Sequence, residues 1–179
     1  MAVNKLTGRQ RQRGTFVIEC ALVLGVLVLL IGFTSDIISW QAVYARLQRM
    51  AHSGATLIRE RELLFADREV LTNDDVQKLY QITRQSLTRT YGDFAPGQLG
   101  LYVEQVERQY PSGQWSSVAF HQGSPCRPAR TLKGNSRLFP ADQSLIIYQV
   151  TVCYPADSYY QALLGNGGVL IASTLMPGR

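Results

Sequence analysis

One carboxylate interrupts an otherwise apolar run near the N-terminus. Glu19 lies five residues after Gly14, in a segment, 15–35, that carries no other charged residue. At about 1.5 Å of rise per residue, a helix over this segment would be about 31 Å long, which matches the hydrocarbon thickness of a membrane. A carboxylate costs about 2.5 to 3.5 kcal/mol at the centre of a spanning helix and less near an interface. We therefore expect Glu19 to recognise a partner; a glutamate merely tolerated at the interface is the alternative.

Groups that could perform catalysis or hold a metal ion are sparse. The two histidines, His52 on an expected helix and His121 in an expected loop, belong to no ligand spacing such as His-x-x-x-His. His121 and Cys126 could serve as base and nucleophile, although a disulfide is the other fate open to Cys126. The glycine-rich run 165–168 precedes an expected strand and lacks a following Lys-Ser/Thr, so it predicts a turn and no phosphate site. We expect no enzyme, no metal and no cofactor.

The three cysteines fall into two groups. Cys20 lies inside the apolar segment, whereas Cys126 and Cys153 are the only pair outside it. Exported proteins in an oxidising compartment tend to pair their thiols, so we predict a Cys126–Cys153 disulfide. Cys20 is expected to be a small apolar side chain that faces lipid or a neighbouring helix, with acylation or an intermolecular bridge as alternatives.

The excess positive charge is confined to the first 14 residues. The net charge is +5, and Lys5, Arg9, Arg11 and Arg13 supply +4 of it with no acid before Gly14. A nucleic-acid-binding protein would spread such charge over a folded surface, so this class is excluded. Lys and Arg beside a membrane segment stay on the cytoplasmic side. The remainder of the chain is then expected to be exported.

The basic leader, Gly14 and a glutamate at the fifth position of an apolar helix resemble the processing site of type IV prepilins. The resemblance implies that a membrane peptidase cuts after Gly14, that Thr15 becomes the methylated first residue, and that Glu19 docks one subunit onto another. Many pilins have Phe or Met where this chain has Thr15, and major pilins of the tight-adherence (Flp) branch carry Tyr where it has Cys20. The chain is also longer than those major pilins. These departures favour a TadE/TadF-like minor pilin or pseudopilin.

Beyond the anchor the pattern predicts two helices followed by a small sheet. Apolar and small residues recur at helical spacing after Asp36, at Trp40, Tyr44, Leu47, Ala51, Gly54 and Ile58. This stripe could pack on the protein's own sheet or on neighbouring subunits. Thr72 followed by Asp75 predicts a capping box at the start of a second helix that ends near Gly92.

Strands are expected at four places, with alternating side chains and turn residues between them: 99–110, 115–120, 145–154 and 169–174. A surface loop, 121–144, would hold Cys126, and a short helical turn is expected at 159–164. The predicted class is α+β and pilin-like. The predicted domains are a leader (1–14), the transmembrane half of a long helix (15–35), an extracytoplasmic helical region (36–98) and a β-rich periplasmic domain (99–179).

These observations indicate a minor pilin or pseudopilin of the bacterial inner membrane, with a cytoplasmic N-terminus and a periplasmic C-terminal domain. The resemblance implies a prepilin peptidase, the major Flp pilin, other pseudopilins, an inner-membrane platform and an assembly ATPase as partners. An uncleaved single-pass protein with a periplasmic binding domain is the main alternative. A secreted enzyme with a cleaved signal is the third, and it predicts a soluble product that begins beyond Ser35.

Overall fold

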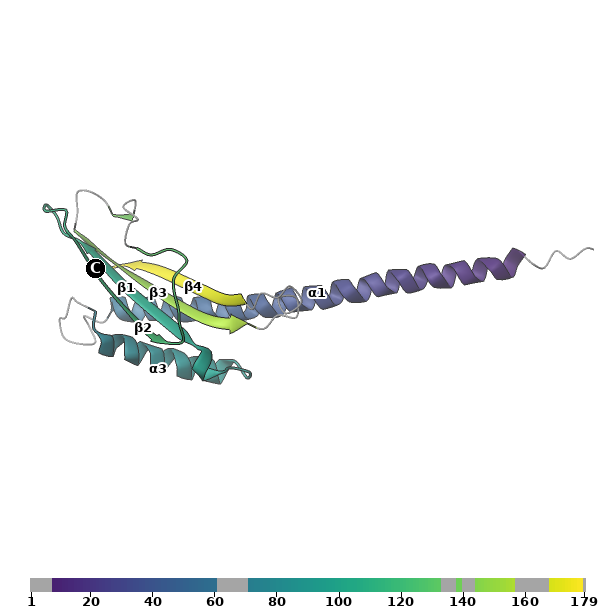
Figure 1. The fold of residues 1–179 in the computed structure, drawn as a ribbon, viewed down its shortest axis with the longest axis horizontal. Coiled ribbons are helices and arrows are strands. Elements are labelled where there is room, and N and C mark those ends of the chain that lie inside the picture. Colours follow the sequence, from purple (N-terminus) through teal and green to yellow (C-terminus); the bar gives the residue numbers. More distant parts are fainter. Residues whose placement is uncertain (1–7, 61–70, 133–137, 140–143, 157–167, 179) are drawn as a thin grey trace, which may run out of the picture. The chain divides into compact units, whose positions relative to one another are not determined.

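The computed structural model describes residues 8–60, 71–132, 138–139, 144–156 and 168–178. In these residues two helices and a short 3₁₀ helix precede four strands (Figure 1), which confirms the predicted α+β class. The elements are α1 (Gly8–Arg59), α3 (Asn73–Thr90), η1 (Pro96–Gln98), β1 (Gly100–Arg108), β2 (Trp115–Gly123), β3 (Leu145–Ala156) and β4 (Gly168–Pro177). The expected helical turn at 159–164 and most of the glycine-rich turn lie outside the described residues.

Helix α1 is longer than the predicted anchor at its start. It begins at Gly8, inside the basic leader, and continues without proline to Arg59. Hydroxyl groups near the end of the apolar stretch donate back to carbonyl oxygens one turn earlier: Thr34 Oγ1 to Leu30 O at 2.7 Å and Ser35 Oγ to Ile31 O at 2.9 Å. Such bonds leave no unsatisfied hydroxyl where water is scarce. The chain divides into two compact units, Met1–Trp40 and Gln41–Arg179.

Helix α3 starts where the sequence predicts. Thr72 has extended backbone angles and its side chain accepts a hydrogen bond from Asp75 N, while the Asp75 carboxylate accepts one from Thr72 N at 3.1 Å. The predicted capping box is therefore confirmed, and it satisfies two of the backbone donors that a helix start leaves open. The apolar face of this helix, with Val76, Leu79 and Leu87, is buried.

The four strands form one antiparallel sheet in the order β2-β1-β3-β4. Strands β1 and β2 form a hairpin: Gln109 N donates to Gln114 O at 3.0 Å, and Gly113 takes a φ of 67°, which suits glycine at a tight turn. The strand predicted at 145–154 is β3, which runs on to Ala156, and β2 runs on to Gly123. His121 therefore lies in a strand, and its prediction as a loop residue was wrong.

The main core lies between one face of the sheet and the two helices. The even-numbered residues of β3, such as Val150 and Val152, are fully buried there, as the strand pattern predicts. Leu47, Ala51 and Ile58 of α1 belong to the same cluster, so this part of the helical stripe packs on the protein's own sheet. A Cβ on Gly54 would lie 3.3 Å from Leu79 side-chain carbons, which means that glycine allows this close approach.

Candidate membrane anchor and docking site

The N-terminal part of α1 exposes a long, mostly apolar surface. Phe16, Leu22 and Leu29 are 69%, 66% and 72% exposed, and every side chain from Thr15 to Thr34 is exposed. Within the described residues, α1 is the one helix long and apolar enough to cross a membrane. Burying so much apolar surface in lipid or against other helices is strongly favourable.

Glu19 lies on this apolar surface, one turn after Thr15. The two residues are four apart in α1, so their side chains leave the same face of the helix. The other residues at three- and four-residue spacing from Glu19 are apolar: Phe16 before it, and Leu22 and Val23 after it. Cys20, the next residue, is an exposed free cysteine. An unpaired carboxylate costs free energy in apolar surroundings, and pairing with a cation would lower that cost.

Gly14 and Thr15 both have helical backbone. Since α1 starts at Gly8, the peptide bond between them lies about two turns inside the helix. A peptidase that cuts this bond would have to act on a helical segment or unwind it.

Cys126 and Cys153 are joined by a disulfide, with their Cα atoms 5.5 Å apart. Both are almost completely buried, at 7% and 2% exposure. The bond attaches the segment after β2 to the face of the sheet opposite the helices. Gly100 lies beneath this segment, because a Cβ there would be 2.5 Å from Ser124 O and 2.8 Å from Cys126 Cβ. Cys126 is therefore not available as a nucleophile.

A buried polar group on the same face was not predicted from the sequence. Glu104 of β1 and Gln149 of β3 are direct cross-strand partners, at 3% and 4% exposure. Leu132 N donates to Glu104 Oε2 at 3.2 Å, and Gln149 Nε2 donates to Arg130 O at 2.9 Å. Both side chains thus hold the segment that crosses the sheet. Strand alternation alone places them on this face, but only the path of residues 124–132 explains their burial.

Tyr102 lies beside this polar group. Partial burial raises the pKa of the Tyr102 phenol. The charge of Glu104 and a long hydrogen bond of 3.5 Å from Tyr102 Oη to Glu104 Oε2 raise it further. The phenol therefore stays protonated beyond its usual range.

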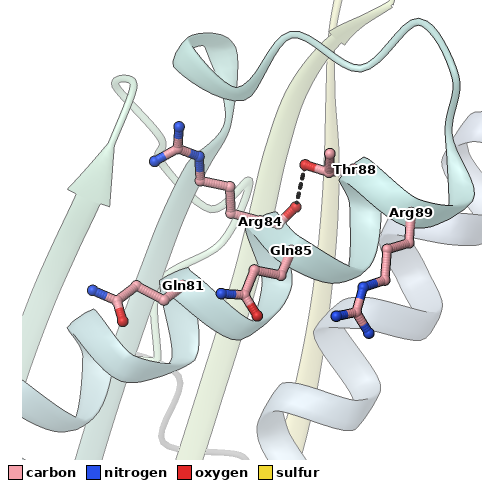
Figure 2. A pocket seen from close by; sticks show the side chains of 5 residues that line it. All are labelled: Gln81, Arg84, Gln85, Thr88 and Arg89. Atoms are coloured by element: carbon pink, nitrogen blue, oxygen red, sulfur yellow. Dashed lines mark hydrogen bonds between the residues drawn. The ribbon is translucent and has the colours of Figure 1, made fainter.

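The outer face of α3 carries polar and basic side chains around a shallow depression (Figure 2). Its lining residues are Gln81, Arg84, Gln85, Thr88 and Arg89. Thr88 Oγ1 donates to Arg84 O at 2.8 Å, so this hydroxyl is already bound to the backbone. None of the five carries a carboxylate, and the Thr88 hydroxyl is their one hydroxyl group. This face was not predicted to be a site, since polar side chains on the exposed side of an amphipathic helix are the ordinary pattern.

No metal-binding cluster of His, Cys, Asp or Glu occurs in the part of the chain that the structure describes. His52 is exposed on α1 and His121 is exposed on β2.

A long apolar N-terminal helix combined with an α+β domain around an antiparallel sheet is the layout of a membrane-anchored, pilin-type subunit. The chain belongs to the TadF family, described as "Putative tight adherence pilin protein F", whose model matches residues 8–179. No curated protein and no solved structure matches the chain. The match begins at the first residue of α1 and covers every helix and strand of the described residues.

Proposed function

We propose that this chain is a minor pilin or pseudopilin for the assembly of a tight-adherence (Flp) type IV pilus, and that its role is structural and not catalytic. The observation that carries the proposal is the single carboxylate, Glu19, on the exposed apolar surface of α1 in a member of a tight-adherence pilin family. An anchor that only held a domain at a membrane would gain nothing from this charge.

The proposed location is the bacterial inner membrane. The leader 1–14 would lie in the cytoplasm because of its basic residues, and the domain with the Cys126–Cys153 disulfide would lie in the oxidising periplasm. A prepilin peptidase would remove the leader after Gly14. The major Flp pilin, other pseudopilins, the inner-membrane platform and the assembly ATPase would then be its partners.

The proposed docking mechanism is electrostatic. Cleavage removes four positive side chains and creates an ammonium group on Thr15, one helical turn from Glu19. In a low-dielectric environment this ammonium and a Glu19 carboxylate attract each other strongly, within one chain or between neighbours. Pairing offsets the cost of holding the acid in lipid. It also fixes the axial position of one helix against the next.

One observation favours the alternative, an uncleaved single-pass membrane protein with a periplasmic binding domain. Helix α1 passes through the Gly14–Thr15 bond without a break, so the bond carries no local extended segment for a peptidase. The N-terminal sequence of the protein recovered from membranes separates the two functions. A start at Thr15 supports the pilin, and a start at Met1 supports the uncleaved anchor.

Substitution of Glu19 tests the docking role. Glu19→Ala should leave membrane insertion and cleavage unchanged but abolish pilus assembly, because the partner's ammonium loses its carboxylate. Cys20→Ala is the matched control, since it changes the adjacent residue at the same depth and should assemble normally. Pilus counts by electron microscopy and N-terminal analysis of the membrane fraction give the two readouts. Normal pili on cells that carry only Glu19→Ala would refute the docking role.

A further inference from the structure

The sheet has two outer strands, β2 and β4, at opposite ends of the order β2-β1-β3-β4. An outer strand presents a row of backbone donors and acceptors that no neighbouring strand uses. Proteins usually protect such rows with charged side chains or cover them.

One hydrogen bond shows which residues of β4 point their backbone N–H and C=O groups away from the sheet. Gly178 N donates to Ile146 O at 2.7 Å, so the Ile146–Gly178 pair is hydrogen-bonded. Antiparallel pairs alternate between bonded and non-bonded. The backbone groups of the even-numbered residues of β4 therefore bond to β3, and those of the odd-numbered residues point away from the sheet. Pro177, which has no N–H, falls in the outward row, where proline is tolerated.

The same odd-numbered residues of β4 expose apolar side chains. Val169, Ile171 and Leu175 are 53%, 38% and 46% exposed. The strand contains no Asp, Glu, Lys or Arg along its whole length. One backbone group of the outward row is bonded to a side chain of α1, since Gln48 Nε2 donates to Ser173 O at 3.4 Å. This outer strand is therefore long, apolar and without protecting charge.

The outward row of β2 follows in the same way. Ser124 N donates to Leu99 O and Gln109 N donates to Gln114 O. These two bonded pairs lie just beyond the two ends of the β1–β2 pairing. By alternation, the odd-numbered residues of β2 point outward. They include Ser117, Ala119 and His121, which are exposed. Strand β2 also lacks Asp, Glu, Lys and Arg.

The direction of the strands decides which edges can meet. Each neighbouring pair in the sheet is antiparallel, so β2 and β3 run one way while β1 and β4 run the other. When a second copy is placed beside the first in the same orientation, its β2 lies antiparallel to β4 of the first. The alternation of strand directions then continues across the junction. A second copy of this chain in the same orientation therefore offers β4 the strand direction that an antiparallel sheet requires.

We propose that β4 of one copy pairs antiparallel with β2 of a second copy, so that the two sheets join edge to edge. Main-chain hydrogen bonds supply the affinity, as in other strand-addition contacts. The exposed apolar side chains of β4 would lie beside the odd-numbered side chains of β2, which are on the same face of the sheet. They include the small side chain of Ala119 and that of Trp115, which is 47% exposed. A contact between two different surfaces repeats from copy to copy and builds an open chain of subunits.

This contact forms through the folded domain, so it depends neither on cleavage after Gly14 nor on Glu19. Its test uses the full-length chain in detergent, with mass measured by sedimentation velocity. Ile171→Lys places a charge in the outward row of β4, and Ala119→Lys does so in β2. Ile82→Lys is the matched control, because Ile82 is an exposed isoleucine on α3, at 53% exposure. Circular dichroism checks that each variant is folded.

The wild type and Ile82→Lys should self-associate, whereas each edge variant alone should bind itself at least about tenfold more weakly, as expected when a charge enters a strand edge. A mixture of Ile171→Lys and Ala119→Lys should recover association but stop at dimers, since one intact β4 and one intact β2 remain. Dimers of Ala119→Lys alone would indicate pairing between two β4 strands and overturn the proposal. A monomeric wild type, an Ile171→Lys variant that associates normally, or a mixture without recovery would overturn it too.

Discussion

Removing the Cys126–Cys153 disulfide should destabilise the C-terminal domain by an amount that the loop length predicts. The cysteines are 27 residues apart in the sequence. In the chain-entropy treatment, a loop of this size contributes about 3.5 kcal/mol to the free energy of unfolding. Because both sulfurs are buried, Cys126→Ala/Cys153→Ala is preferred to a serine pair, which would bury two hydroxyls.

The assay is urea unfolding followed by tryptophan fluorescence. Trp115 is a suitable probe because its ring packs edge-on against Phe139, with ring centroids 4.7 Å apart, on the face that carries the disulfide. Trp40 is replaced by Phe in all samples, so that Trp115 is the only tryptophan. With an m value of about 1–3 kcal/mol/M, the midpoint should fall by more than about 1 M.

The control is reduction. Dithiothreitol should shift the midpoint of the protein with both cysteines and leave that of the double alanine variant unchanged. A midpoint difference below about 0.3 M between the two oxidised samples would refute the loop-entropy reasoning, since it corresponds to less than about 1 kcal/mol.

Two further predictions concern the sheet. Gly123→Ala should be more destabilising than Gly113→Ala, although both glycines have positive φ, at 77° and 67°. An added Cβ at Gly123 would lie 2.7 Å from a Tyr80 ring carbon and against a backbone carbonyl, whereas one at Gly113 would have nothing within 4 Å. The Gly113 variant should lose about 1–2 kcal/mol in urea unfolding, and an equal loss in both would contradict the steric explanation. The raised pKa of Tyr102, caused first by burial and then by Glu104, predicts a pH effect. Above pH of about 10 the unfolded state releases this proton first, so stability should fall as pH rises. The free energy of unfolding should fall less between pH 9 and 11 in Tyr102→Phe than in the wild type. An identical fall would contradict the assignment of this pH effect to Tyr102.

Local patterns predicted the elements well. Thr72 and Asp75 gave the start of α3 because a capping box depends on four consecutive residues. The alternation in β3 placed Val150 and Val152 in the core because strand periodicity fixes which face each side chain takes.

Contacts between distant segments were not predictable in this way. The burial of Glu104 depends on residues 130–132, which cross the sheet, and no local pattern reports that path. His121 was expected in a loop because Gly123 and Pro125 suggest an early end to the strand, yet pairing with β1 extends β2 to Gly123. The start of α1 at Gly8 was also missed, because the leader has no apolar periodicity, although Arg and Gln favour helix.

The segment after β2 is attached to the sheet at two points of different chemistry. The disulfide holds its beginning at Cys126, and the Glu104 and Gln149 side chains hold the backbone at Leu132 and Arg130. A reductant breaks only the first attachment. Within residues 124–132, the proteolytic nicking that reduction adds would therefore fall around Cys126, while the end near Leu132 keeps its protection and its amide exchanges slowly with solvent.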